Sequence, residues 1–340
     1  MHNNKYLISI SIPSYNRPEE LKRLLNSIDS KYPARIQIVI CEDKSPLREE
    51  VRKIVEEYKR STIYDLKYIE NPQNYGFDKS IRTLIERADG EYILYMGDDD
   101  MFIPNALDKF IYFVKNHTEC GYFLRSYRNV YKNGSIEYFR YYSDNKFFEP
   151  SEKTYAELFL KSVFMSGFTI KTEYVKNITT DIFDSTLLFQ LYLVGEVCLN
   201  YPSAYFNIPF TQGIQGDTIP LFGNSEIEKG LYTPGRTQQN DINFYKSFFK
   251  ITKYIDKKYS INSTEVIRKE ISKYSFPLMA RWRSCGIKEF KEYCHELRRM
   301  ELDCTIYFDV YYFGLLLFGK KFCQGLIRII KRILGRRPNL

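Results

Sequence analysis

The first third of the chain repeats one pattern: an apolar run rich in β-branched residues, a polar turn and an amphipathic stretch. The apolar runs predict four strands, at residues 6–12, 36–41, 65–69 and 91–96. The stretches between them are typical of helices; the first places Leu21, Leu24, Leu25 and Ile28 on one helical face. Strands that alternate with helices indicate an α/β fold, with a mostly parallel sheet flanked by helices.

A polar cluster follows each of these strands, and the clusters read PSYN, EDKS, NPQNYG and GDDD. In sheets of this kind, ligands bind beyond the carboxyl ends of the parallel strands. We therefore expect all four clusters to line one edge of the sheet and one cleft.

The pattern changes after residue 118. The sequence predicts, in order, a β-hairpin over 120–142, a helix over 152–163, a short strand near 164–170 and a helix from about Asp184 to Glu196. Residues 211–237 are rich in Gly, Pro and Thr, which predicts a long mobile loop, and such loops often act as lids. From residue 241 the pattern is helical to the end. The expected organisation is one domain over 1–240 and a helical C-terminal region over 241–340.

Charge and cysteine content narrow the function classes. The net charge is +8, but seven of the positive charges lie in the last 21 residues, at Lys320, Lys321, Arg328, Lys331, Arg332, Arg336 and Arg337. Most of the net positive charge therefore lies in the C-terminal tail, and we expect no nucleic-acid partner. Seven widely spaced cysteines without a CxxC pair favour reduced thiols over a zinc site. With three histidines in the chain, carboxylates are the expected catalytic groups.

Three consecutive aspartates, Asp98, Asp99 and Asp100, come directly after a strand that reads as buried. Like charges at such distances repel unless a cation lies among them. A helix cap or a solvated turn is the simpler interpretation of this cluster. The alternative is Mg²⁺ or Mn²⁺ bound to carboxylate oxygens and to a phosphate ligand, whereas the spacing of a calcium loop is absent.

The other clusters also allow two interpretations each. Asp43 either caps a turn or accepts a hydrogen bond from a nucleobase N–H, and Tyr15 either packs or contacts a base or ribose. Asn74 shapes a turn under both interpretations. Lys79 and Arg82 either reach a diphosphate or lie on a solvated helix face.

Several nucleotide-binding motifs are absent: the chain has no P-loop, and no G-x-G-x-x-G follows the first strand. The segments ISIPSYNRPEELKRLLNSI, IQIVICEDKSP and NYGFDKSIRTLIERADGEYILYMGDDD instead resemble the family 2 glycosyltransferases of GT-A fold. The motifs NYGFDK and GDDD most closely resemble those of the abequosyltransferase-like branch, which builds bacterial surface polysaccharides. The resemblance implies a nucleotide-sugar-binding half over 1–118 and an acceptor half over 119–240.

The same resemblance implies roles for single residues. Pro13 and Tyr15 match positions of the nucleoside pocket, and Asp43 matches the aspartate that reads the base. Asn74 and Lys79 fall in the segment that continues this donor site. The family's usual arginine after N-x-G aligns with Ile81, so Lys79 or Arg82 must substitute for it.

The metal motif departs from the frequent D-x-D-D form, since its first aspartate falls on Gly97. The resemblance then implies that Asp98 contacts the ribose and that Asp99 binds the metal, with Asp100 as a second ligand or a helix cap. For an inverting transfer, a base must deprotonate the acceptor hydroxyl. Asp184 is the first candidate for it, Asp181 the second and Asp217 a further one, although an N-cap is the common role for an Asp before a helix.

The tail of the chain predicts a further contact. Five apolar residues fall on one helical face among basic residues, which is typical of a helix in an anionic membrane interface or of a helix docked on the core: Phe322, Leu326, Ile329, Ile330 and Ile333. We predict no signal peptide and no membrane span, since the apolar stretch 306–319 is shorter than the ~20 residues that spanning needs.

These inferences combine into one hypothesis. The protein is expected to be a cytoplasmic glycosyltransferase, peripheral on the inner face of the cytoplasmic membrane, that needs a divalent cation (Mn²⁺ or Mg²⁺). It would move a sugar from a nucleotide-diphosphate donor to a saccharide or lipid-linked saccharide acceptor in surface polysaccharide synthesis. The alternatives are a sugar nucleotidyltransferase and a non-catalytic nucleotide-sugar-binding protein.

Overall fold

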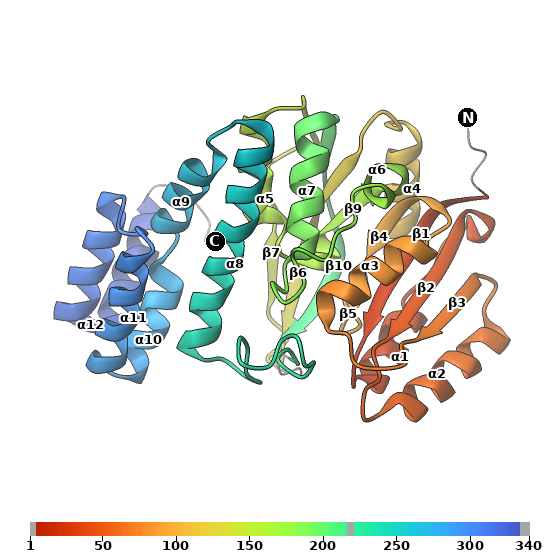
Figure 1. The fold of residues 1–340 in the computed structure, drawn as a ribbon, viewed down its shortest axis with the longest axis horizontal. Coiled ribbons are helices and arrows are strands. Elements are labelled where there is room, and N and C mark those ends of the chain that lie inside the picture. Colours follow the sequence, from red (N-terminus) through yellow and green to blue (C-terminus); the bar gives the residue numbers. More distant parts are fainter. Residues whose placement is uncertain (1–4, 216–220, 334–340) are drawn as a thin grey trace. The chain divides into compact units, whose positions relative to one another are not determined.

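The computed structural model describes residues 5–215 and 221–333 of the chain (Figure 1). The chain divides into two units, residues 1–236 and residues 237–340. Asp217, a candidate base, and the last residues of the basic tail lie outside the described residues.

The first unit contains a ten-stranded mixed sheet in the order β3-β2-β1-β4-β9-β6-β10-β5, with β7 beside β6 and β8 beside β10. The strands are β1 (Tyr6–Ser14), β2 (Ile36–Glu42), β3 (Asp65–Glu70), β4 (Gly90–Tyr95), β5 (Asp100–Phe102), β6 (Tyr122–Tyr131), β7 (Ile136–Phe139), β8 (Lys146–Phe148), β9 (Phe168–Lys171) and β10 (Ser203–Gln215). β1 to β4 pair in parallel, as predicted, whereas β9 joins β4 and β6 in antiparallel register. This α/β architecture brings the carboxyl ends of β1 to β4 to one edge.

Helices cover both faces of this sheet. They are α1 (Pro18–Asn26), α2 (Arg48–Ser61), α3 (Phe77–Arg87), α4 (Ala106–Lys115), α5 (Glu152–Phe159), α6 (Thr172–Lys176) and α7 (Phe189–Asn200). α1, α2 and α4 pack on one face with Ile8, Ile10 and Ile12, and α3, α6 and α7 pack together on the other (Figure 1). The predicted stripe of α1 is buried, because Leu21 and Leu24 point into this core.

Two sequence-based expectations for the second half were wrong in position. α7 begins at Phe189 rather than near Asp184, because Ser185 and Leu187 have positive φ angles of 72° and 59°, which a helix does not allow. The expected loop over 211–237 begins late, because residues 211–215 continue β10 and pair with β6. Residues 221–236 contain no helix.

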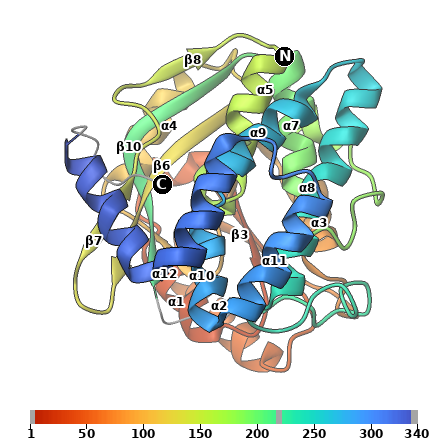
Figure 2. The same ribbon diagram turned by 90° about the vertical axis from the view of Figure 1, so that its left-hand side faces the viewer.

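The second unit consists of five helices within its described residues (Figure 2). They are α8 (Gln238–Tyr259), α9 (Ser263–Lys273), α10 (Phe276–Cys285), α11 (Ile287–Arg299) and α12 (Ile306–Ile333). α10 packs against α11 and α12, and α12 bends at Gly319, whose φ of 73° interrupts the helix. Among the described residues, no helix is both long enough and apolar enough to span a membrane.

Candidate active site

The turns that follow β1 to β4 meet at one edge of the sheet, as the sequence predicted. The Asp43 N–H donates to the Ser14 carbonyl at 3.1 Å, and the Asn71 N–H donates to the Glu42 carbonyl at 2.9 Å. The Tyr15 N–H donates to Oδ2 of Asp98 at 3.1 Å, which joins turns 83 residues apart in sequence. The polar clusters therefore form one continuous surface.

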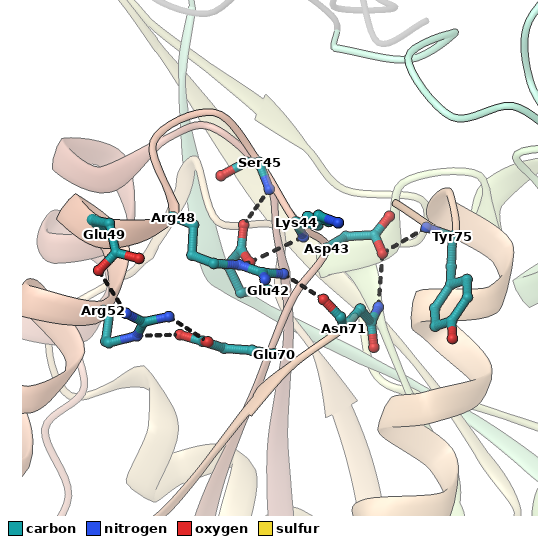
Figure 3. Close-up of polar contacts among 10 residues, drawn as sticks. All are labelled: Glu42, Asp43, Lys44, Ser45, Arg48, Glu49, Arg52, Glu70, Asn71 and Tyr75. Carbon is teal, nitrogen blue, oxygen red and sulfur yellow. Dashed lines mark hydrogen bonds and ion pairs between the residues drawn. The ribbon is translucent and has the colours of Figure 1, made fainter. Parts of the chain in front are cut away.

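Asp43 lies buried at the centre of this edge and accepts three hydrogen bonds, of which those from Asn71 and Tyr75 are drawn in Figure 3. Its Oδ1 accepts from Asn71 Nδ2 at 2.7 Å and from the Tyr75 N–H at 2.9 Å, and its Oδ2 accepts from the Gly76 N–H at 2.8 Å. A carboxylate offers about four acceptor positions, so one remains for a ligand N–H. Burial raises the pKa of Asp43, although these hydrogen bonds oppose the shift.

Neighbouring side chains fix the turn that carries Asp43. Glu42 is fully buried and accepts hydrogen bonds from the N–H groups of Lys44 (3.0 Å) and Ser45 (2.6 Å) and from Arg48 Nε (2.5 Å) (Figure 3). Arg48 Nη2 also donates to the Asn71 carbonyl at 2.5 Å. Glu42 thus has a structural role, which leaves Asp43 as the acceptor presented at the edge.

Tyr15 and Asn74 lie beside Asp43. Burial raises the pKa of the Tyr15 phenol, and a hydrogen bond with Asn74 opposes this shift. Asn74 Oδ1 accepts from the Gly76 N–H at 3.1 Å, which shapes the turn as predicted. Pro13, in β1 and half-buried, lies two residues before Tyr15 and pairs with Cys41, two residues before Asp43, in the sheet. The predicted nucleoside-pocket residues therefore lie together, and their contacts with a ligand remain a prediction.

Arg17 is the cation that the structure places among the three aspartates. Its Nη1 lies 2.9 Å from Oδ1 of Asp98 and 3.1 Å from Oδ2 of Asp99. Burial raises the pKa of Asp98 to about 7, and Asp99 adds to the shift, whereas Arg17 opposes it. Sequence reasoning did not identify Arg17, although it directly follows the PSYN cluster.

The three aspartates differ in their surroundings. Asp98 and Asp100 are buried, while the Asp99 side chain is 28% exposed. Asp100 Oδ2 accepts a 2.5 Å hydrogen bond from the hydroxyl of Ser166, which also accepts from the Gly97 N–H at 2.7 Å. Burial, followed by the charge of Asp99, raises the pKa of Asp100 well above its ordinary value.

The donor set at this position fits Mg²⁺ or Mn²⁺, because carboxylate oxygens are the hard ligands that these ions prefer. Asp99, the most exposed of the three, is the best placed to reach such an ion. Within the described ranges, no group of three or more His, Cys, Asp or Glu side chains forms a ready metal site. A bound cation would therefore share Asp99 with Arg17 or displace it, and would take further ligands from substrate or water.

The sheet edge that carries Asp43, Asp98 and Asp99 is called the donor edge below. Helix α3 connects this edge with the turn before α7. Lys79 Nζ lies 3.5 Å from the centre of the Tyr75 ring, and Arg82 Nη2 forms an ion pair with Oδ2 of Asp184. Asp78 is fully buried and accepts from the N–H groups of Leu187 (2.8 Å) and Phe189 (2.9 Å), so it caps α7. Arg82 therefore holds a candidate base, while Lys79 remains beside the donor edge.

The candidate bases differ in exposure. Asp184 is partly buried, which raises its pKa, and Arg82 counteracts this shift; its Oδ1 is buried without a hydrogen-bond partner. Asp181 is exposed, and its carbonyl accepts from the Asp184 N–H at 2.9 Å. Both side chains lie before α7, as the sequence implied, and neither is the N-cap of that helix, which is Leu188.

Glu228 contributes to the donor edge from the segment after β10, and sequence reasoning missed it. Its buried carboxylate accepts from the N–H groups of Phe77 at 2.9 Å and Gly223 at 2.8 Å, so it caps the start of α3. A side chain at Gly76, whose φ is 81°, would meet the Glu228 carboxylate at 2.7 Å. Nothing in the composition of residues 221–236 marks this position, because the contact joins segments 151 residues apart.

Comparisons with known proteins agree with this geometry. Residues 9–171 match the model of Glycosyl transferase family 2. The chain is 30% identical over 101 residues to the abequosyltransferase RfbV of Salmonella typhimurium, and 28% identical over 154 residues to an Escherichia coli glucosyltransferase, WfgD, which uses UDP-Glc and α-D-GlcNAc-diphosphoundecaprenol. These matches cover 30% and 45% of this chain, and 30% and 55% of the two relatives.

The solved structures agree on the fold. The crystal structure of S. aureus TarS 1–349 in complex with UDP-GlcNAc superposes with a TM-score of 0.54 at 15% identity, over 94% of this chain and 92% of that one. The predicted GT-A fold with a helical C-terminal region is thereby confirmed. Residues 9–171, just under half of the chain, are therefore similar to glycosyl transferase family 2.

Proposed function

We propose that the protein is a glycosyltransferase that takes a sugar from a nucleotide-diphosphate donor. The observation that supports the proposal is the arrangement of the donor edge, where Asp43 and Tyr15 lie beside Asp98 and Asp99. Asp43 has one acceptor position left, and these residues lie within the region that matches family 2. An N–H of a nucleobase would donate to Asp43, and the ribose hydroxyls would approach Asp98. Asn74 keeps the turn between them in place.

A divalent cation, Mn²⁺ or Mg²⁺, belongs to the same proposal. Asp99 would hold it, with Asp100 as a second ligand once the carboxylate releases the Ser166 hydroxyl. When bound, the cation would supply positive charge that stabilises the departing nucleoside diphosphate. Lys79 would add a charge at the same side of the edge, since its ammonium lies over the Tyr75 ring next to Asp43.

Asp184 is the proposed base for an inverting transfer, with Asp181 as the second candidate. Burial raises the pKa of Asp184 toward the range in which a carboxylate accepts protons efficiently, and Arg82 keeps the carboxylate oriented. The deprotonated acceptor hydroxyl would then attack the anomeric carbon as the bond to the diphosphate breaks.

For the acceptor, we propose a saccharide attached to a lipid, in the synthesis of bacterial surface polysaccharide. The support is the similarity to WfgD, whose name states a diphosphoundecaprenol-linked acceptor, and to an abequosyltransferase. A lipid-linked acceptor would place the reaction at a membrane surface, on the cytoplasmic side where nucleotide sugars are available.

Thermal shift with nucleoside diphosphates, each measured with Mn²⁺ and with EDTA, tests the donor site. We expect at least one diphosphate to stabilise the wild type with Mn²⁺, and Asp99→Asn to lose this effect. Asp144→Asn is the matched control, because Asp144 is exposed and contacts Ser143 rather than the donor edge. The proposal fails if no diphosphate stabilises the protein, or if Asp99→Asn responds as the wild type does.

Product analysis separates the proposal from its alternatives. With the stabilising nucleotide as its sugar conjugate and a lipid-linked saccharide extract, a glycosyltransferase releases the nucleoside diphosphate. Pyrophosphate release from a sugar phosphate and a nucleoside triphosphate would instead show a nucleotidyltransferase. Binding of the conjugate without turnover on any acceptor would indicate a non-catalytic binding protein.

A further inference from the structure

Helix α12 has two apolar faces, and its first half uses one of them for packing. Phe308 and Leu315 are fully buried, and Arg283 Nε donates to the Leu315 carbonyl at 2.9 Å. The Tyr312 ring, on the same face, lies 4.1 Å below the Arg298 guanidinium. These contacts come from α10 and α11, so this half of the helix is held on its own unit (Figure 2).

The opposite face of this half is also apolar and is exposed. Ile306, Val310, Phe313 and Leu317 follow at spacings of four, three and four residues, which puts them on one side of a helix. Their exposed fractions run from 54% at Phe313 to 75% at Ile306. A water-facing stripe of this length needs a partner, since isolated exposed apolar residues are common but contiguous ones mark contact surfaces.

The stripe continues beyond the bend at Gly319. Phe322, Leu326 and Ile329 share one side of the second half, and Phe318 lies directly before the bend; each of these side chains is between 47% and 60% exposed. The rings of Phe318 and Phe322 lie 5.0 Å apart, so they form a continuous apolar patch. The bend thus joins two apolar segments, of which sequence analysis had identified the second.

Charge indicates what covers the stripe. No acidic residue follows Asp309, whereas seven basic residues follow Leu317, beginning with Lys320 and Lys321 next to the bend. A second copy of this chain would bring the same positive charges together, and they would repel. A bilayer containing anionic lipids offers apolar depth for the stripe and negative charge for the basic residues.

We propose that α12, from Ile306 onward, is a membrane-docking surface for an anionic bilayer. The exposed stripe lies in the interface while the opposite face of the first half stays packed on α10 and α11. The membrane contact expected from the basic tail is thereby extended to the half of α12 that precedes Gly319. The proposal does not depend on sugar transfer. A lipid-linked acceptor would nevertheless be within reach of a protein docked in this way.

Flotation of the full chain with vesicles tests the surface. One set contains phosphatidylcholine alone, and the other contains equal parts of phosphatidylcholine and phosphatidylglycerol. We expect flotation with the anionic set, reduced by high salt because salt screens the basic residues. The double variant Phe313→Ser with Leu317→Ser should bind about tenfold more weakly or worse, because two half-exposed side chains lose their apolar burial.

The matched control is Ile63→Ser, which removes an apolar side chain that is 73% exposed in the first unit. It should float as the wild type does. Lys320→Gln with Lys321→Gln should weaken binding roughly fivefold for each charge removed. Unchanged melting of each variant shows that it folds.

Three results would overturn the proposal. They are equal flotation of the wild type and the Phe313→Ser, Leu317→Ser variant, no flotation with anionic vesicles, or a wild-type dimer that this variant converts to a monomer. The last result would assign the stripe to a second copy of the chain. Because the vesicles contain no sugar acceptor, a failure here leaves the proposed transferase activity untouched.

Discussion

Removal of Arg17 is the perturbation that most directly probes the aspartate cluster. Arg17→Met keeps the unbranched stem of the side chain and removes the guanidinium that contacts Asp98 and Asp99. Asp98 is buried and would then keep the Tyr15 N–H as its hydrogen-bond donor at 3.1 Å. Its charge would lie within a group of three carboxylates that repel one another.

The expected loss follows from the burial of this pair. Removing one partner of a buried ion pair costs about 3 to 5 kcal/mol. The Arg17 side chain is 18% exposed, so water screens part of the effect and we expect the lower end, about 3 kcal/mol. For a unit of 236 residues this corresponds to a fall in Tm of roughly 6 to 12 °C.

Thermal melting in EDTA measures this loss, with Arg52→Met as the matched control. Arg52 pairs with Glu49 and Glu70 on the surface, where ion pairs contribute little to stability. If Arg17→Met lowers the Tm no more than the control does, the role of Arg17 as the counter-ion is refuted.

A metal titration extends the same experiment. Mn²⁺ should raise the Tm of Arg17→Met more than that of the wild type, because the ion supplies the missing positive charge and no longer competes with a guanidinium. Equal shifts in both proteins would show that Arg17 and the metal do not share Asp99.

Three further changes test the contacts around α3. Burial raises the pKa of Asp78 to about 7, so the folded chain binds a proton more tightly than the unfolded chain does. The free energy of unfolding should therefore fall by at most about 4 kcal/mol between pH 4 and 7. Asp78→Asn should remove this pH dependence in urea titrations. Glu228→Gln leaves one acceptor oxygen for two N–H donors, so the amides of Phe77 or Gly223 should exchange hydrogen faster, at a cost of about 1 to 3 kcal/mol. Arg82→Met should shift the acid limb of the pH–rate profile upward if Asp184 is the base, because Arg82 lowers the pKa of Asp184; a lower kcat with an unmoved limb would exclude that role.

Local pattern was sufficient for β1 to β4 but not for the short β5. The four parallel strands and α1 were predictable because their apolar residues recur with the period of the element that buries them, as Leu21 and Leu24 do. The start of α7 was not predictable in this way. Positive φ angles at Ser185 and Leu187 stop the helix, and neither residue type signals such a conformation.

The residues of the candidate site also differ in whether local sequence predicts them. Asp43, Asp98 and Asp99 follow strands whose ends meet at one edge, so topology alone brought them together. The partners that complete the site, Arg17 and Glu228, depend on contacts across long sequence separations, 81 and 151 residues. The three aspartates implied that a cation was required, but repulsion alone does not distinguish an arginine from a metal ion.

Charge at the donor edge gives a reason to expect both kinds of cation. The edge holds the carboxylates of Asp43, Asp98, Asp99 and Glu228, and Arg17 offsets part of this charge. A diphosphate brings further negative charge, and two like charges about 5 Å apart cost roughly 3 kcal/mol at an effective dielectric constant of 20. Arg17 already serves two aspartates and cannot also neutralise a diphosphate. An uncharged nucleoside meets no such repulsion, so we expect it to bind equally with and without Mn²⁺, whereas the corresponding diphosphate should require the ion.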